Sequence, residues 1–247
     1  MSGHSKWANI KHRKAASDAK KGKLFTKIAR DLESAARQGG GDPEANFNLR
    51  LALDKARAAN MPKENVERAI KRGTGELQGE QLDEIFYEAY GPNGTAIMLK
   101  ALTDNRNRTV SEIRTALRKH GGSLGESGSV AWQFDYKGLI LVPADGQDPE
   151  AVMLTAIDAG AEDVEVEDGY IEITTDRSDL QSVQEALSNA GVQIESAELS
   201  MVPKTTIPLD FEQQLSLVKL IDVLEELDDI QQVYTNVELS NEVLEAA

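Results

Sequence analysis

Apolar residues recur along the chain with two different periods, and the period changes near residue 80. Up to residue 72 they are spaced three or four positions apart, which predicts amphipathic helices. Asp42 and Pro43 suit the N-cap and the first position of the second of these helices. The pattern predicts a small helical bundle, with helices over residues 20–37, 43–60 and 62–72.

Beyond residue 82 the apolar residues fall in short runs, which are typical of β-strands. Gly91-Pro92-Asn93-Gly94 separates the first two runs and is a strong hairpin signal. A helical period then precedes a loop rich in Gly and Ser and one more short run. The predicted elements are strands at 85–90 and 95–102, a helix at 109–120 and a strand at 130–134.

Residues 136–203 follow a regular order of strand, helix, strand, strand, helix and strand. This β-α-β-β-α-β order is the split pattern of a ferredoxin-like sandwich, which forms a complete domain by itself. The predicted elements are strands at 139–142, 163–167, 170–174 and 192–201, and helices at 149–159 and 180–190.

The last segment, a helix over 210–227 and a strand over 230–237, is too short to bury a core alone. Because region 83–134 lacks a second helix, the two segments together complete one α+β sandwich around an insertion. The predicted fold class is α+β multidomain: an N-terminal helical bundle followed by two α+β (ferredoxin-like) domains, one inserted in the other. The predicted domains are a basic helical bundle at 1–80, a discontinuous α+β domain at 81–135 and 204–247, and an inserted ferredoxin-like domain at 136–203.

Charge is distributed unevenly over the 247 residues. The formal net charge is -15, yet residues 1–75 carry 17 Lys or Arg against 8 Asp or Glu, and the remainder carries 10 against 34. The sequence therefore predicts that residues 1–75 form a basic head that binds a polyanion. The remainder of the chain is an acidic body that would repel a nucleic acid lying alongside it, so contact is expected at the head.

The first thirty residues hold nine of these cations and a single acid, Asp18. In the predicted helix 20–37 the cations lie opposite an apolar arc, so one face suits a core and the other suits phosphates. Trp7 lies among cations, a mixture that binds nucleic acid by stacking and phosphate neutralisation. The alternative is that Trp7 packs onto the bundle and the lysines form a solvated face, although solvated faces usually mix both signs. The candidate nucleic-acid-binding residues are Lys6, Trp7, Lys11, His12, Arg13, Lys14, Lys20, Lys21, Lys23, Lys27 and Arg30.

A second basic segment runs from Lys100 to Lys119, with six basic residues against two acids. Within it, Arg106 and Arg108 stand where a strand passes into a helix, beside backbone N–H groups that favour anions. They are candidates for a second anion site. The alternative is a helix cap whose arginines pair with the acidic body.

Several other kinds of chemistry find no support in the sequence. The chain has no cysteine, which excludes disulfides, thiolate metal sites and thiol nucleophiles. Its three histidines match no catalytic triad, and its acidic clusters lack the spacing of a known cation site. We therefore expect no enzyme activity, no metal and no cofactor. No apolar run approaches the roughly 20 residues that span a bilayer, and no signal peptide is recognisable, so we expect a cytoplasmic protein without a membrane partner.

Short blocks spread over the whole chain resemble one family. They include Gly3-His4-Ser5-Lys6-Trp7, Gly39-Gly40-Gly41-Asp42-Pro43, Asp104-Asn105-Arg106-Asn107-Arg108-Thr109, Gly128-Ser129-Val130-Ala131 and Val233-Tyr234. On these residues the chain is identified as a member of the YebC family. The resemblance implies a helical bundle and two α+β domains in a protein usually described as a DNA-binding transcriptional regulator. The family also contains organellar translational activators, and its members are implicated in helping ribosomes through proline runs.

We therefore expect a nucleic-acid-binding regulator of transcription that contacts DNA phosphates through its basic head. The alternative is a ribosome-associated translation factor in which the same head binds ribosomal RNA. No presequence is recognisable ahead of Met1, so we expect a bacterial member of the family rather than an organellar precursor. The sequence leaves the oligomeric state open.

Overall fold

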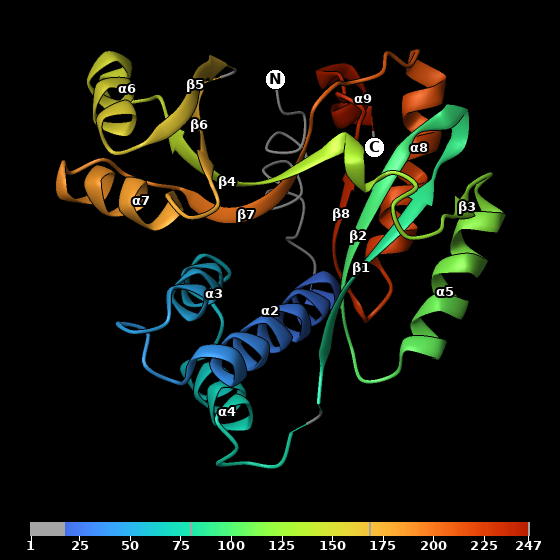
Figure 1. Cartoon of the computed structure of the whole chain (residues 1–247), viewed down its shortest axis with the longest axis horizontal. Helices are drawn as coiled ribbons and strands as arrows, with labels where there is room; N and C mark the ends of the chain where they lie inside the picture. The colour runs from blue at the N-terminus through green and yellow to red at the C-terminus, as the bar shows by residue number, and fades with distance from the viewer. Residues whose placement is uncertain (1–17, 80, 168, 247) are drawn as a thin grey trace. The chain divides into compact units, whose positions relative to one another are not determined.

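The computed structural model describes residues 18–246 of the chain, apart from residues 80 and 168 (Figure 1). The described residues divide into two compact units. Residues 135–202 form one unit, and residues 18–134 together with 203–246 form the other.

Three helices form a bundle at the start of the larger unit. α2 (Asp18–Gly39), α3 (Phe47–Ala58) and α4 (Lys63–Gly73) pack their apolar faces together. Leu32 and Leu49 are fully buried in this core. α2 and α4 approach closely at Gly73, where a Cβ atom would overlap the carbonyl oxygen of Glu33. Glycine at this position therefore permits the close contact between the two helices.

The start of α3 differs from the sequence prediction, because the helix begins four residues later than residue 43. Its N-cap is Asn46, not Asp42: the Asn46 side chain accepts a hydrogen bond from Leu49 N at 3.1 Å. The same side chain donates to the carbonyl oxygens of Ala35 and Gly40, both at 2.8 Å. Asn46 thus satisfies backbone groups at the start of α3 and near the end of α2, which a cap at Asp42 would not do.

An antiparallel sheet in the order β3-β1-β2-β8 forms the rest of the larger unit. β1 (Asp83–Tyr90) and β2 (Ala96–Thr103) form the predicted hairpin around the short 3-10 turn η1 (Pro92–Gly94). β3 (Ser123–Leu124) pairs with β1, and β8 (Ile230–Thr235) pairs with β2. Three helices complete the unit: α5 (Arg106–Lys119), α8 (Phe211–Glu225) and α9 (Asn241–Ala246).

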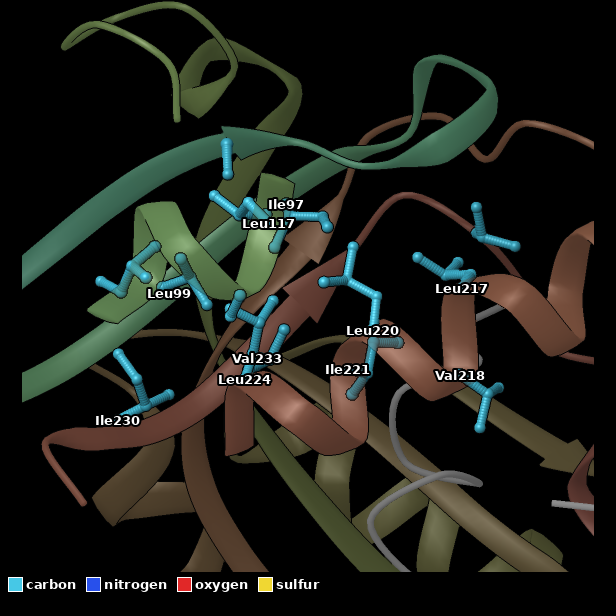
Figure 2. Close-up of a cluster of buried hydrophobic side chains, with 14 of the residues drawn as sticks. Ile97, Leu99, Leu117, Leu217, Val218, Leu220, Ile221, Leu224, Ile230 and Val233 are labelled. Carbon is cyan, nitrogen blue, oxygen red and sulfur yellow. The ribbon is translucent and has the colours of Figure 1, made fainter. Parts of the chain in front are cut away.

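The core of this unit joins segments from both sides of the inserted residues. Figure 2 shows Leu99 of β2, Leu117 of α5 and Ile221 of α8 directed into one cluster, together with Val233 of β8. Leu99 and Leu117 are fully buried, and Ile221 is nearly so. The carboxyl-terminal segment therefore completes the core that β1, β2 and α5 begin.

The predicted strand over residues 130–134 is wrong for most of its length. Residues Ala131–Gln133 form the 3-10 turn η2, and β4 begins at Phe134. The carboxylate of Glu88 accepts hydrogen bonds from the backbone N–H groups of Val130 and Ala131 at 2.7 and 2.8 Å. These donors serve a buried side chain and are not available to a strand ladder, so the third strand of the sheet is β3 instead.

The smaller unit has its own antiparallel sheet, in the order β5-β6-β4-β7. This order, with helices after the first and third strands, matches the predicted ferredoxin-like pattern. The fold class predicted from the sequence is thereby confirmed, while the exact domain boundaries stay a prediction. The elements are β4 (Phe134–Pro143), α6 (Pro149–Asp158), β5 (Ala161–Glu167), β6 (Tyr170–Asp176), α7 (Leu180–Asn189) and β7 (Ser196–Pro203).

Candidate nucleic-acid interface

Three of the predicted phosphate-binding cations on α2 bind the main chain at the end of α8. Lys23 Nζ donates to the carbonyl oxygen of Glu226 at 3.2 Å, and Lys27 Nζ donates to that of Glu225 at 2.7 Å. Arg30 donates to the carbonyl oxygen of Asp228 at 2.5 Å. These cations lie four and then three positions apart, so they occupy one face of α2.

The contacts have a clear electrostatic cause. The last carbonyl groups of a helix lack intrahelical donors and carry the negative end of the helix dipole. α8 has no basic residue in its own last turn. Lys23, Lys27 and Arg30 therefore supply from α2 the positive charge that stabilises the end of α8.

A buried carboxylate lies at the centre of the same contact. Asp229 is 1% exposed. Its Oδ1 atom accepts a hydrogen bond from Arg30 at 3.0 Å, and its Oδ2 atom accepts one from Arg108 at 2.8 Å. Thr109 Oγ1 donates to Oδ2 at 2.7 Å, and Thr103 Oγ1 donates to it at 3.2 Å. We call these five residues the Asp229 cluster; it joins the helical bundle to the α+β sandwich within the larger unit.

Ionisation of Asp229 is favoured by these partners. Burial alone would raise the pKa of its carboxyl, but hydrogen bonds from Thr109, Arg108 and Arg30 and the charge of Arg108 hold that pKa below its usual value. The pKa of the Arg108 guanidinium is raised, chiefly by its hydrogen bonds to Asp229 and Asp104. The cluster is therefore an ion pair network in which the carboxylate carries its full charge at neutral pH.

The candidate second anion site lies at the N-terminus of α5. Asn105 caps the helix, accepting a hydrogen bond from Arg108 N at 3.1 Å. Arg106 pairs with Asp83 at 3.0 Å, and Arg108 pairs with Asp104 at 2.7 Å as well as with Asp229. Both arginines thus contact carboxylates of the protein itself, as the alternative interpretation of the sequence expects, and their binding of an external anion stays a prediction.

The remaining predicted contacts are placed only in part. Lys21 is exposed on α2 and forms no ion pair with any residue that the structure describes. Lys20 belongs to α2, but its side chain is outside the described part of the chain. The other candidates lie outside the described residues: Lys6, Trp7, Lys11, His12, Arg13 and Lys14.

α4 carries cations that the sequence interpretation did not single out. Arg68, Lys71 and Arg72 are exposed, and none of them forms an ion pair with a residue in the described ranges. Lys71 and Arg72 follow Arg68 by three and four positions, so the three side chains share one face of α4, away from Val66 and Ile70, which pack against the bundle core. Their helical spacing is the signal in the sequence that indicates this cationic face.

The other end of α5 has a similar set. Arg114, Arg118 and Lys119 are exposed and have no ion pair partner among the residues described. The second basic segment therefore divides into paired arginines at the N-terminus of the helix and unpaired cations toward its C-terminus. Only the second group can attract an external phosphate without first losing an internal partner.

No helix among the described residues is long and apolar enough to cross a membrane. No group of three or more His, Cys, Asp or Glu side chains is arranged there to hold a metal ion.

Fold and charge together define a multidomain α+β protein with a cationic helical bundle at its amino-terminal end. Comparison with known proteins makes the assignment specific. Residues 5–76 match the family model of the TACO1/YebC protein N-terminal domain, and residues 82–237 match that of the TACO1/YebC second and third domain. The chain therefore belongs to the TACO1/YebC family, which confirms the resemblance seen in the sequence.

Individual relatives are similar in sequence to this chain over nearly their whole length. The chain is 55% identical to a "probable transcriptional regulatory protein" of Thermoanaerobacter pseudethanolicus, over 98% of this chain and 99% of the relative. It is also 55% identical to a protein of the same description from Persephonella marina, over 99% of each. A crystal structure of a conserved hypothetical protein, Aq1575 from Aquifex aeolicus, superimposes with a TM-score of 0.86 at 49% identity, covering 95% of this chain and 97% of the other.

Proposed function

We propose that this protein is a nucleic-acid-binding regulator of transcription, without enzymatic activity, that acts in the cytoplasm and holds DNA by its phosphate backbone. The observation that carries the proposal is the set of exposed, unpaired cations on the helical bundle, above all Arg68, Lys71 and Arg72 among the described residues. The description of the relatives as transcriptional regulatory proteins supports the regulatory role.

The charge pattern also favours contact with DNA through the basic residues 1–75, which we call the bundle end. The remaining candidates, in residues 6–14 and at Lys20 and Lys21, belong to the same basic amino-terminal segment of the sequence. Residues 135–202, in contrast, carry 16 acids and two basic residues. A phosphodiester backbone is attracted to the first region and repelled by the second, so binding by the bundle end is the arrangement of lowest electrostatic energy.

The test is the salt dependence of binding to a labelled 20-base-pair DNA duplex, measured by fluorescence anisotropy between 50 and 200 mM salt. Neutralisation of about 6 to 10 phosphates makes affinity fall by about 10³ to 10⁵ over this range. Changing Arg68, Lys71 and Arg72 to alanine is expected to reduce the slope of log affinity against log salt by about 3.

A matched control removes Arg57 and Lys63, which are exposed on the same bundle but already pair with Asp54 and Glu67. This control is expected to leave the slope within about 0.5 of the wild type. A second variant changes Lys11, Arg13 and Lys14 to alanine, and we expect a similar loss of slope. Salt-independent binding by the wild type, or full slopes in both alanine variants, would refute phosphate contact by the bundle end.

A second candidate function is that of a ribosome-associated translation factor. It is favoured by the anionic residues 135–202, because a strongly negative unit suits contact with basic proteins next to RNA. In this case the bundle end binds ribosomal RNA. Cosedimentation with purified ribosomes at 100 mM salt, compared with retention on the DNA duplex at the same salt, separates the two functions.

A further inference from the structure

Two exposed aromatic rings lie at one edge of the larger unit. Trp132 is 68% exposed and Tyr90 is 40% exposed. The Trp132 indole N–H donates to the carbonyl oxygen of Ser129 at 3.1 Å, and the Tyr90 hydroxyl donates to the same oxygen at 3.2 Å. Both polar tips therefore have an internal partner, and what the pair offers to solvent is ring surface.

The segment that carries Trp132 is firmly anchored. Glu88 is 8% exposed, and its carboxylate accepts hydrogen bonds from the backbone N–H groups of Gly128, Val130 and Ala131 at 2.6, 2.7 and 2.8 Å. These bonds hold the pKa of Glu88 below its usual value, although burial alone would raise it. On the other side of Trp132, the carbonyl oxygen of Gln133 accepts from Lys204 N at 2.8 Å. An exposed ring on such a support loses little conformational freedom on binding.

Two exposed cations of α5 precede a segment that lies beside Tyr90. Ser123 of β3 pairs with Tyr90 of β1, so the segment that follows α5 runs beside the end of β1. A Cβ atom on Gly122 would lie 2.7 Å from the Tyr90 carbonyl oxygen, which shows how closely this segment approaches. Arg118 and Lys119 occupy the last turn of α5, immediately before it, and both are exposed.

We propose that Trp132 and Tyr90 stack against an unpaired nucleobase while Arg118 and Lys119 contact the phosphates that flank it. This inference rests on the proposed nucleic-acid binding and names the form of nucleic acid that the larger unit takes: a single-stranded segment of RNA or DNA. Aromatic side chains beside cations are the usual arrangement for single strands, because every base offers a ring face for stacking. Bases within a duplex are already stacked on their neighbours and do not present that face.

A protein partner fits the same surface less well. Tryptophan at protein interfaces generally combines its ring surface with a hydrogen bond from the indole N–H to the partner. In this structure the indole N–H and the tyrosine hydroxyl both already donate to Ser129. The cations at the end of α5 add attraction for phosphate.

Tryptophan fluorescence tests the stacking directly. The chain has two tryptophans, Trp7 and Trp132, so Trp7→Phe leaves Trp132 as the only indole. Titration of this full-length variant with 12-nucleotide oligo(U) and oligo(dT) is expected to quench its emission, whereas a 12-base-pair duplex leaves the emission nearly unchanged. The two oligonucleotides compare RNA with DNA. Absence of quenching by both single strands overturns the inference.

Affinity measurements on variants complete the test. Trp132→Ala is expected to weaken binding of the single strands by about 5- to 150-fold, whereas Trp132→Phe retains affinity within about 3-fold because the ring remains. Leu154→Ala removes an apolar side chain of similar exposed fraction from the other unit and serves as the control. Because Trp132 is exposed, Trp132→Ala should retain the circular dichroism spectrum of the wild type.

The outcomes also separate this inference from the proposed function. If Trp132→Ala binds single strands and the duplex as the wild type does, the stacking site is refuted and phosphate binding by the bundle stands. If the variant loses a protein from affinity purification while oligonucleotide binding is unchanged, the surface is a protein interface and the inference fails. If the wild type binds neither single strands nor the duplex at 50 mM salt, both proposals fail together.

Discussion

α2 and α4 belong to one bundle, carry cations at helical spacing on one face, and use these cations differently. On α2, Lys23 and Lys27 donate to carbonyl oxygens at the end of α8. On α4, Lys71 and its neighbours point to solvent without an ion pair partner among the described residues. The lesson is that a cluster of positive charge in a sequence does not by itself identify a binding surface. What decides is whether the fold places acceptors opposite those charges.

The largest effect is expected where α2 meets a buried carboxylate. Asp229→Asn removes the charge that Arg30 and Arg108 share, and it leaves two cations facing an amide. We expect a loss of about 3 kcal/mol in the free energy of unfolding, at the lower end for a broken buried pair because Arg108 is partly exposed. Urea denaturation followed by circular dichroism measures this loss.

The neighbouring carboxylate provides the control for this substitution. Asp228 is exposed, and Asp228→Asn should change the free energy of unfolding by less than about 0.5 kcal/mol. Equal losses in the two variants would mean that burial and pairing of Asp229 contribute nothing, and the contrast between the two helices would lose its main support.

The same cluster predicts how stability depends on pH. The pKa of Asp229 is lower in the folded protein than its usual value, so the unfolded chain binds a proton more readily than the folded one. Its contribution to stability is therefore fully present above about pH 4 and is lost as pH falls through the folded pKa. Glu88, whose pKa is also lowered, acts in the same direction.

Urea denaturation at pH values from 7 down to 3 tests this dependence. For the wild type, the free energy of unfolding should fall on acidification below about pH 4. In Asp229→Asn the fall should be shallower, because one of the groups responsible is absent. Parallel curves for the two proteins would show that Asp229 has the same pKa in the folded and unfolded states.

The contrast between the helices also marks what could be predicted from the sequence. Local patterns sufficed for the three bundle helices, for the β1–β2 hairpin and for the ferredoxin-like order of the smaller unit. They failed for β3, because a two-residue strand has no period, and for residues 130–134, whose apolar run resembles a strand. The backbone N–H groups of Val130 and Ala131 instead donate to the carboxylate of Glu88, which lies more than 40 positions earlier in the sequence.

The partners of the α2 cations could not be predicted from local sequence patterns. Lys23 and the carbonyl group that it binds are 203 positions apart, and Arg30 and Asp229 are 199 apart. No spacing in the sequence indicates such a pair, because it depends on how α8 returns to the sheet that β1 and β2 begin. The exposed ring of Trp132 was overlooked for a related reason: in a segment expected to be a strand, an aromatic residue is ordinarily part of the packing.

The smallest effect comes from comparing one lysine of each helix, with methionine as a substitute that keeps the aliphatic stem. Lys27→Met removes the donor that binds Glu225 O at 2.7 Å and is expected to lower the free energy of unfolding by about 1 kcal/mol. Lys71→Met removes an exposed cation and is expected to change stability by less than about 0.5 kcal/mol. The binding data should show the reverse order: Lys71→Met reduces the salt slope for the DNA duplex by about 1, and Lys27→Met leaves it unchanged. If Lys27→Met lowers the slope without loss of stability, Lys27 contacts DNA phosphate and not the end of α8. The distinction between the two helices then fails.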